Sequence, residues 1–213
     1  MNFTAIDRAN WVREEYFEHY TSRVPCTYSM TVHLDITNLL RQSREREKKL
    51  YPLLIYGISR AVNAHREFKM AIRSGVLGFY DTVHPNYTVF HREEETFSTL
   101  WTEYGGNLID FYQRYLRDVK EYGHLLRLEP KGPREDIFFV SCLPWTSFTG
   151  FELQIKNGFG DLRPVFTLGK FFEAEGKTML PLAVQVHHGV CDGFHLCRLV
   201  NELQSWVGQL TLV

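Results

Sequence analysis

The 213-residue chain has few of the features that mark exported, membrane-bound or nucleic-acid-binding proteins. Its N-terminal segment contains Asp7 and no apolar core of a signal peptide, and no uninterrupted apolar run approaches the ~18 residues that a membrane span needs. Lys and Arg total 24 against 25 Asp and Glu, so no basic field favours binding to nucleic acid or to a membrane. We therefore expect a cytoplasmic protein whose partner is a small molecule.

Cysteine is also scarce, and none of the four cysteines lies in a C-x-x-C motif. In a chain of this length without an export signal, Cys26, Cys142, Cys191 and Cys197 are expected to be free thiols rather than disulfides. The eight prolines and fifteen glycines are scattered, and no low-complexity tract or repeat marks a boundary. We expect one domain that covers residues 1–213.

Two kinds of apolar periodicity occur along the chain. Residues 27–36 alternate apolar and polar side chains, which predicts a half-exposed strand. Shorter strands are predicted at residues 69–72, 76–80, 87–91, 96–101, 137–143, 151–155, 165–172 and 178–186. Helices are predicted from an N-cap at Asn10 to before Pro25, from Pro52 onward, over about residues 108–119, and over residues 194–207. Strands outnumber helices, so the pattern indicates an α+β fold with a mixed sheet covered by helices.

Residues 185–195 read QVHHGVCDGFH and lie where a buried strand meets the last helix. On its own, the pair His187 and His188 is better explained as ordinary polar residues at a strand end. Asp192 could orient a histidine in a catalytic triad, but Asp-Gly before a helical pattern is typical of an N-cap. A zinc site is not expected, because the spacing of His187, His188, Cys191, Asp192 and His195 fits no familiar set of ligands. His195 is expected to pack or to form hydrogen bonds on the helix.

The segment 185–195 resembles the signature motif of the chloramphenicol acetyltransferase family. The resemblance extends to two further segments, Ser141-Cys142-Leu143-Pro144-Trp145 and the opening Asn10-Trp11-Val12-Arg13. The shorter core His188-x-x-x-Asp192-Gly193 is shared by the wider group of coenzyme A-dependent acyltransferases. The resemblance implies a two-layer sandwich and a homotrimer with active sites at the subunit interfaces. It also implies transfer of acetyl from acetyl-CoA, the co-substrate, to the primary hydroxyl of chloramphenicol, with no metal and no acyl-enzyme.

The resemblance assigns roles to five residues. His188 would be the general base, and its neutral imidazole suits this task because the ordinary histidine pKa is about 6.5. Ser141 would donate a hydrogen bond to the oxyanion that forms. Asp192 would pair with Arg13 and shape the site, and the ring of His188 would be oriented by its own backbone carbonyl. Thr167 would help to hold the intermediate through water.

Further residues match the binding sites of the family by position. The residues on the acceptor side are Tyr20, Cys26, Tyr28, Thr88, Phe97, Leu153, Ile155 and Val165. The residues on the coenzyme A side are Trp145, Phe171, Lys49 and Lys170, where the lysines would lie near phosphates. The chain departs from the family at Phe171, where a tyrosine is frequent, and at Phe139, where some members have asparagine.

Two alternatives stay open. A core of the dihydrolipoyl acyltransferase type, which would act on a thiol or on another hydroxyl, would share the His and Asp-Gly motif, but those proteins also carry lipoyl and subunit-binding domains. A non-catalytic ligand-binding homologue would keep the fold, although the intact set of His188, Ser141 and Arg13 argues against it.

Overall fold

The computed structural model describes residues 2–154 and 160–212. Its strands are β1 (Phe3–Ala5), β2 (Thr27–Asp35), β3 (Met70–Arg73), β4 (Val76–Tyr80), β5 (His84–His91), β6 (Thr96–Trp101), β7 (Ile137–Leu143), β8 (Val165–Gly169), β9 (Phe172–Ala174) and β10 (Lys177–His187). Its α-helices are α1 (Glu14–Glu18), α2 (Thr37–Glu45), α3 (Leu50–Ala64), α4 (Leu108–Tyr122) and α5 (Gly193–Gln209). Short 3-10 helices cover Arg8–Asn10 and Arg66–Phe68, and a π-helix, His19–Arg23, follows α1.

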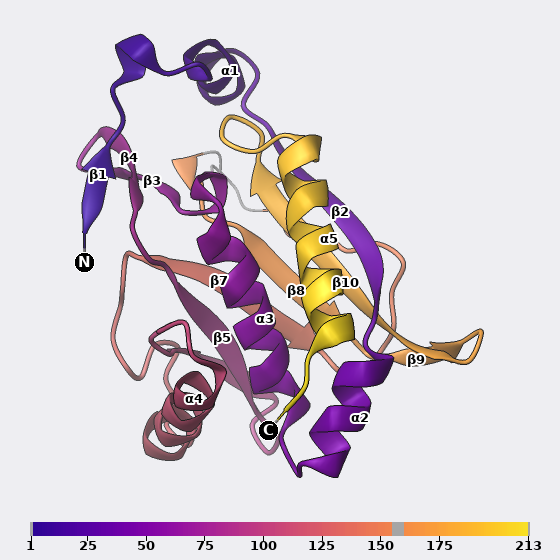
Figure 1. Cartoon of the computed structure of the whole chain (residues 1–213). Helices are drawn as coiled ribbons and strands as arrows, with labels where there is room; N and C mark the ends of the chain where they lie inside the picture. The colour runs from indigo at the N-terminus through magenta and orange to yellow at the C-terminus, as the bar shows by residue number, and fades with distance from the viewer. Residues whose placement is uncertain (1, 155–159, 213) are drawn as a thin grey trace.

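The main sheet is mixed, with the strand order β2-β10-β8-β7-β5-β6 and with β9 paired to β10. Strands β5, β7 and β8 are parallel, and the other pairs of this sheet are antiparallel. Helices α3 and α5 run side by side across one face of the sheet, while β1, β4 and β3 form a small separate sheet (Figure 1). The predicted α+β fold with a mixed sheet and covering helices is confirmed.

The hydrophobic core lies between the sheet and these helices. Val140 of β7, Phe166 of β8 and Val184 of β10 are buried and belong to one cluster with Ile55 of α3 and Leu199 of α5. Because alternate residues of a strand point to opposite faces, the residues between them point away from the helices. This second face, which we call the open face, carries the candidate site.

Register places two rows of side chains on the open face. In one row, Ser141 of β7 is paired with Thr167 of β8, which is paired with Ala183 of β10. In the next row, the paired residues are Asn86, Phe139, Val165 and Gln185, from β5, β7, β8 and β10. The hydroxyl of Ser141 is therefore fixed in the middle of the open face by the pairing of β7 with β8 and of β8 with β10.

Several predicted elements differ from the structure. Asn10 is not an N-cap but ends a 3-10 helix capped by Asp7, and α1 begins only at Glu14. The strand predicted at 165–172 is divided into β8 and β9, and α2 and β1 were not predicted. Residues 151–154 form no strand, because the N–H of Leu153 donates to the side chain of Gln185 instead of to a neighbouring strand. Residue 155 lies outside the described residues.

Other predictions agree closely with the structure. The strand expected at 27–36 is β2, and Pro52 lies in the first turn of α3, where its missing N–H is tolerated. All four cysteines are free thiols. Within residues 2–154 and 160–212, no helix is long and apolar enough to cross a bilayer.

Candidate active site

The candidate base His188 lies at the corner between β10 and α5. Its backbone N–H donates to the carbonyl of Cys26 at 3.0 Å, which ties the corner to the start of β2. The preceding His187 is the last residue of β10 and is buried, and its Nδ1 accepts a hydrogen bond from the N–H of Gly189 at 3.0 Å. The two neighbouring histidines therefore have different environments, with His187 buried in the turn and His188 partly exposed beyond it.

Asp192 is the N-cap of α5, as the sequence predicts. Its extended backbone (φ −99°, ψ 169°) precedes the helix, and its N–H donates to Nδ1 of His195 at 3.0 Å. Burial lowers the pKa of His195, although the nearby carboxylate of Glu67 opposes this shift. The expected hydrogen-bonding role of His195 on the helix is confirmed.

Arg13 and Asp192 form the predicted ion pair. Both guanidinium Nη atoms contact the carboxylate, with Nη2 at 3.0 Å from Oδ1. These hydrogen bonds lower the pKa of Asp192, although partial burial acts in the opposite direction. Nη2 of Arg13 also reaches the backbone carbonyl of His188 at 3.5 Å. The ion pair thus joins the N-terminal segment to the corner that carries His188.

Two aromatic rings hold the imidazole of His188. The ring of Tyr20 is stacked on it, with centroids 4.0 Å apart and an interplanar angle of 6°. The ring of Tyr28 meets it edge-on at 5.1 Å. The side chain of His188 keeps 29% of its exposure, so the ring is fixed in orientation but accessible from one side.

The expected hydrogen bond from His188 to its own carbonyl is not formed. Nδ1 of His188 is buried, and no hydrogen bond within the described residues reaches it. Oδ1 of Asp192 lies 3.4 Å from this Nδ1, which is close enough for an ion pair but lacks hydrogen-bond geometry. The prediction is wrong for two reasons. The carbonyl of His188 accepts a hydrogen bond from Arg13, and the stacked ring of Tyr20, rather than a local hydrogen bond, orients the imidazole.

A prediction on pH dependence follows from the ion pair. The lowered pKa of Asp192 means that the pair stabilises the fold above the unfolded pKa of about 3.9, and that this contribution is lost as the pH falls through the lower folded pKa. Arg13→Met should lower the free energy of unfolding by about 0.5–1 kcal/mol near pH 7, because the Asp192 side chain is 36% exposed. Denaturant unfolding at a series of pH values should show this difference shrinking below about pH 4.

The matched control is Arg8→Met, which breaks a surface pair with Glu14 and leaves the corner intact. A smaller destabilisation is expected for it. If the two variants lose the same stability, or if the effect of Arg13→Met is unchanged from pH 7 to pH 3, the structural role given to Arg13 is wrong.

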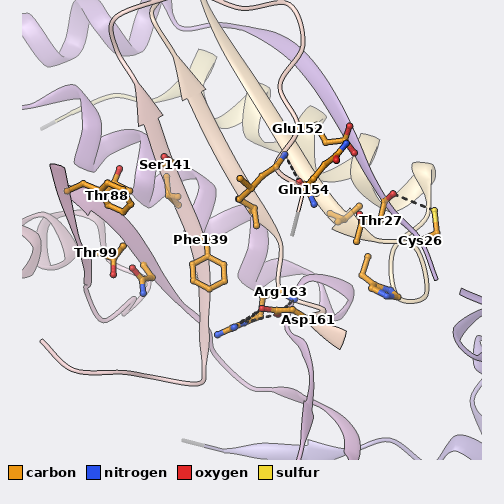
Figure 2. Close-up of a pocket in the computed structure, with 18 of the residues that line it drawn as sticks. Cys26, Thr27, Thr88, Thr99, Phe139, Ser141, Glu152, Gln154, Asp161 and Arg163 are labelled. Carbon is orange, nitrogen blue, oxygen red and sulfur yellow. Dashed lines mark hydrogen bonds and ion pairs between the residues drawn. The ribbon is translucent and has the colours of Figure 1, made fainter. Parts of the chain in front are cut away.

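A pocket of about 840 Å³ opens on the open face of the sheet. Six of the predicted site residues line it, and these are Ser141, Cys26, Thr88, Phe97, Leu153 and Val165. Figure 2 shows Ser141 and Phe139 on one strand, with Thr88 and Thr99 on one side and Thr27 and Cys26 on the other. The mainly apolar wall, with a few hydroxyl and amide groups, is typical of a site for an organic ligand.

The described lining of this pocket includes His187 but not His188, Tyr20 or Tyr28. Thr167 is buried next to Ser141 on the same face of the sheet and is not among the described residues that line the pocket. The structure thus separates the predicted residues into two groups. The first, with Ser141, surrounds the pocket, and the second surrounds His188.

Nearly the whole chain, residues 1–204, matches the model of the family described as Chloramphenicol acetyltransferase. The chain belongs to this family. Curated relatives named chloramphenicol acetyltransferase include one from Campylobacter coli, 49% identical over 207 residues, which cover 96% of this chain and 98% of the relative. Another, from Clostridium perfringens, is 50% identical over 210 residues, which cover 97% of this chain and 99% of the relative.

Solved structures share the fold at lower identity. One described as chloramphenicol acetyltransferase has a TM-score of 0.85 at 23% identity, covering 97% of this chain and all of the other. The cubic core of the pyruvate dehydrogenase multienzyme complex has a TM-score of 0.66 at 18% identity, covering 92% of this chain and 86% of the other. A dihydrolipoamide acetyltransferase from Azotobacter vinelandii also shares the fold, with a TM-score of 0.68 at 18% identity, covering 86% of this chain and 82% of the other.

On the coenzyme side expected from the family, the structure brings three of four residues together. The backbone N–H of Lys170 donates to the carbonyl of Thr146 at 2.9 Å, so Lys170 and Phe171 lie beside the loop that carries Trp145. Trp145 is 57% exposed, and its ring meets Phe90 edge-on at 4.7 Å. Lys49 is exposed at the start of α3, and its N–H donates to the hydroxyl of Tyr112.

The pocket also contains polar residues that the sequence analysis did not select, and these are Thr27, Asn86, Thr99, Glu152, Gln154, Asp161, Arg163 and Gln185. Two of them could have been predicted, because residues two apart in a strand point to the same face. Asn86 precedes the predicted residue Thr88 by two positions, and Thr99 follows the predicted residue Phe97 by two. Asp161 and Arg163 carry no such signal, since they precede β8 and reach the pocket only in the folded chain. Leu153 lines the pocket as predicted, whereas Ile155 lies outside the described residues.

Proposed function

We propose that the protein transfers the acetyl group of acetyl-CoA to the primary hydroxyl of chloramphenicol. The observation that carries this proposal is the pocket of about 840 Å³, which is lined mainly by apolar groups and has Ser141 on its wall. Membership of the family and 48–50% identity to relatives of that name support it. A cytoplasmic location, where acetyl-CoA is available, is part of the same proposal.

The chemistry assigned to His188 is general-base catalysis. As the acceptor hydroxyl oxygen attacks the thioester carbonyl, Nε2 of His188 takes the hydroxyl proton, and a tetrahedral oxyanion forms. Collapse of this intermediate breaks the C–S bond, and the departing thiolate of coenzyme A recovers the proton from the imidazolium. The stacked Tyr20 ring and the nearby Asp192 carboxylate would hold the imidazole through both steps.

Ser141 would donate its hydroxyl hydrogen to the oxyanion. A donor fixed by strand pairing needs no reorganisation when charge develops, and this preorganisation is the main source of such stabilisation. Thr167, buried on the adjacent strand, would position a water molecule for the same intermediate. Burial raises the pKa of Cys142 to about 11 and that of Cys191 to about 12, so neither thiol supplies a competing nucleophile at neutral pH.

Ser141→Ala should lower kcat by about 10²-fold or more with little change in the KM for the acceptor, because an oxyanion donor acts chiefly in the transition state. Steady-state kinetics with acetyl-CoA and chloramphenicol measure both values. Mass spectrometry after mixing the enzyme with acetyl-CoA alone provides the complementary test. An acetyl group trapped on Ser141 would replace direct transfer with a double displacement.

We further infer that the enzyme is a homotrimer and that each site takes His188 from one chain and the pocket from its neighbour. The absence of His188 from the described pocket lining supports this arrangement. Apolar side chains near the His188 corner are also exposed in the single chain: Val12 by 91%, Phe194 by 72% and Tyr16 by 53%. Exposed apolar groups of this kind are typical of surfaces that a partner covers.

Coenzyme A would bind along the exposed loop of Trp145. The indole of Trp145 and the ring of Phe171 offer apolar surface there, and the ammonium groups of Lys170 and Lys49 would meet phosphates. Binding of acetyl-CoA and chloramphenicol can be measured separately from turnover by calorimetry.

A thiol-release assay with acetyl-CoA and a panel of hydroxylated acceptors tests the function as a whole. Release of coenzyme A that depends on chloramphenicol is the expected result. Release that depends on dihydrolipoamide alone would favour an acyltransferase of the dihydrolipoyl type. Binding of chloramphenicol without any thiol release would identify a non-catalytic homologue.

A further inference from the structure

The carboxylate of Glu67 contacts the first turns of α5, next to the corner that carries His188. Glu67 lies in the 3-10 helix Arg66–Phe68, far from that corner in sequence. Its Oε1 lies 3.5 Å from Nε2 of His195, and its Oε2 lies 3.4 Å from Nη2 of Arg198. The side chains of Glu67 and His195 are only 23% and 15% exposed. A carboxylate in such a place beside a histidine influences which ring nitrogen carries the proton.

The hydrogen bonding of His195 fixes the position of its proton. Nδ1 accepts the backbone N–H of Asp192 at 3.0 Å, so Nδ1 must be unprotonated. Burial lowers the pKa of His195, which agrees with a neutral ring. The single proton of the neutral ring is then on Nε2, the nitrogen that faces Glu67. The carboxylate stabilises this tautomer, because it attracts the Nε2–H and would repel a lone pair in the same place.

The unprotonated Nδ1 of His195 in turn holds Asp192 at the start of α5. His195 is the third residue of the helix, where a capping box usually has Glu or Gln as the acceptor. The carboxylate of Asp192 pairs with Arg13 and lies 3.4 Å from Nδ1 of His188. A chain of contacts thus runs from Glu67 through His195 and Asp192 to the imidazole of the proposed base.

We propose that Glu67 is a positioning residue for acetyl transfer, because it holds His195 in the tautomer that fixes Asp192 beside the ring of His188. This inference rests on the proposed function and deepens it. Glu67 is not among the described residues that line the pocket. It therefore acts on the rate of proton transfer and not on the binding of either substrate.

A second ion pair joins the same two parts of the chain and supplies a matched control. Nε2 of His65, directly before the 3-10 helix, lies 2.7 Å from Oε2 of Glu202 on α5. Glu202 is about two helical turns beyond His195, so Glu202→Leu weakens the attachment of this segment to α5 without reaching the first turn of the helix. Arg198→Met is a second control, because it removes the other partner of Glu67 and leaves His195 in place.

The kinetic test compares Glu67→Leu and Glu67→Gln with the wild type, using acetyl-CoA and chloramphenicol. Glu67→Leu should lower kcat about 5- to 10-fold, the effect of losing one polar contact that orients a catalytic group, and should leave both KM values unchanged. Glu67→Gln should keep most of kcat, because its amide oxygen can still accept the Nε2–H. Glu202→Leu and Arg198→Met should turn over like the wild type.

Nitrogen-15 NMR of protein with labelled histidine reports the tautomer directly and without turnover. His195 should be protonated at Nε2 alone in the wild type and in Glu67→Gln, whereas Glu67→Leu should give a mixture of tautomers. A His195→Gln background provides a further check. The amide oxygen of that glutamine can replace Nδ1 as the acceptor for the N–H of Asp192, so adding Glu67→Leu should have no further effect on kcat.

Three outcomes would overturn the proposal, and they are distinguishable. If the wild type does not acetylate chloramphenicol, the proposed function fails and this inference fails with it. If the wild type is active but Glu67→Leu keeps its full kcat, or if the tautomer of His195 does not change, only the inference is wrong. If Glu202→Leu or Arg198→Met lowers kcat as much as Glu67→Leu does, then Glu67 only attaches its segment to α5 and does not act through His195.

Discussion

His188→Ala is expected to lower kcat by about 10²- to 10⁴-fold, the usual range for the loss of a general base. The protein should still fold and bind chloramphenicol, because the side chain is partly exposed and the main-chain hydrogen bond to Cys26 remains. Single-turnover kinetics, together with circular dichroism and calorimetric binding of chloramphenicol, would separate the loss of chemistry from a loss of structure.

His187→Asn is the appropriate control, because the asparagine oxygen can replace Nδ1 as the acceptor for the N–H of Gly189. We expect this variant to lose far less activity than His188→Ala. If the His187 variant is the inactive one, or if His188→Ala turns over like the wild type, the base has been assigned to the wrong histidine.

The fold could be predicted largely because its strands alternate over several residues. The period of two is visible in residues 27–36, and β2 is found there. Helix α2 was missed because it has only two apolar residues, Leu39 and Leu40, in nine, too few to show a helical period, and no side chain caps it at Ile36. At residues 151–154 a strand was predicted from the alternation of apolar and polar side chains, but none forms. The N–H of Leu153 donates to the side chain of Gln185 on β10 instead of to a neighbouring strand.

The candidate site divides in a similar way. Contacts fixed by local geometry or by the family motif, such as Asp192 as N-cap and its pairing with Arg13, could be predicted from sequence. Contacts that depend on the assembled sheet could not. Stacking of Tyr20 on His188 replaces the expected local hydrogen bond, and Arg163 reaches the pocket by packing on Phe139. No sequence period links residues so far apart in the chain.

A shared active site predicts that two inactive variants can restore activity in a mixed trimer. One chain carries His188→Ala and the other carries Ser141→Ala, and each homotrimer should have at most residual activity. In a mixed trimer, one of the three interfaces joins an intact His188 to an intact Ser141 of its neighbour. Random mixing at one to one makes about three quarters of the trimers mixed, so about a quarter of all sites should be intact.

The experiment unfolds the two variants together and refolds them, with size-exclusion chromatography to verify that trimers form. Activity should rise toward about a quarter of the wild-type value, far above the sum of the separately refolded variants. Combining the folded variants without unfolding is the control, since intact trimers that do not exchange chains should give no gain. If refolded mixed trimers show only the sum of the residual activities, then His188 and Ser141 act within one chain. In that case the two groups of site residues must approach each other by a movement of the His188 corner toward the pocket.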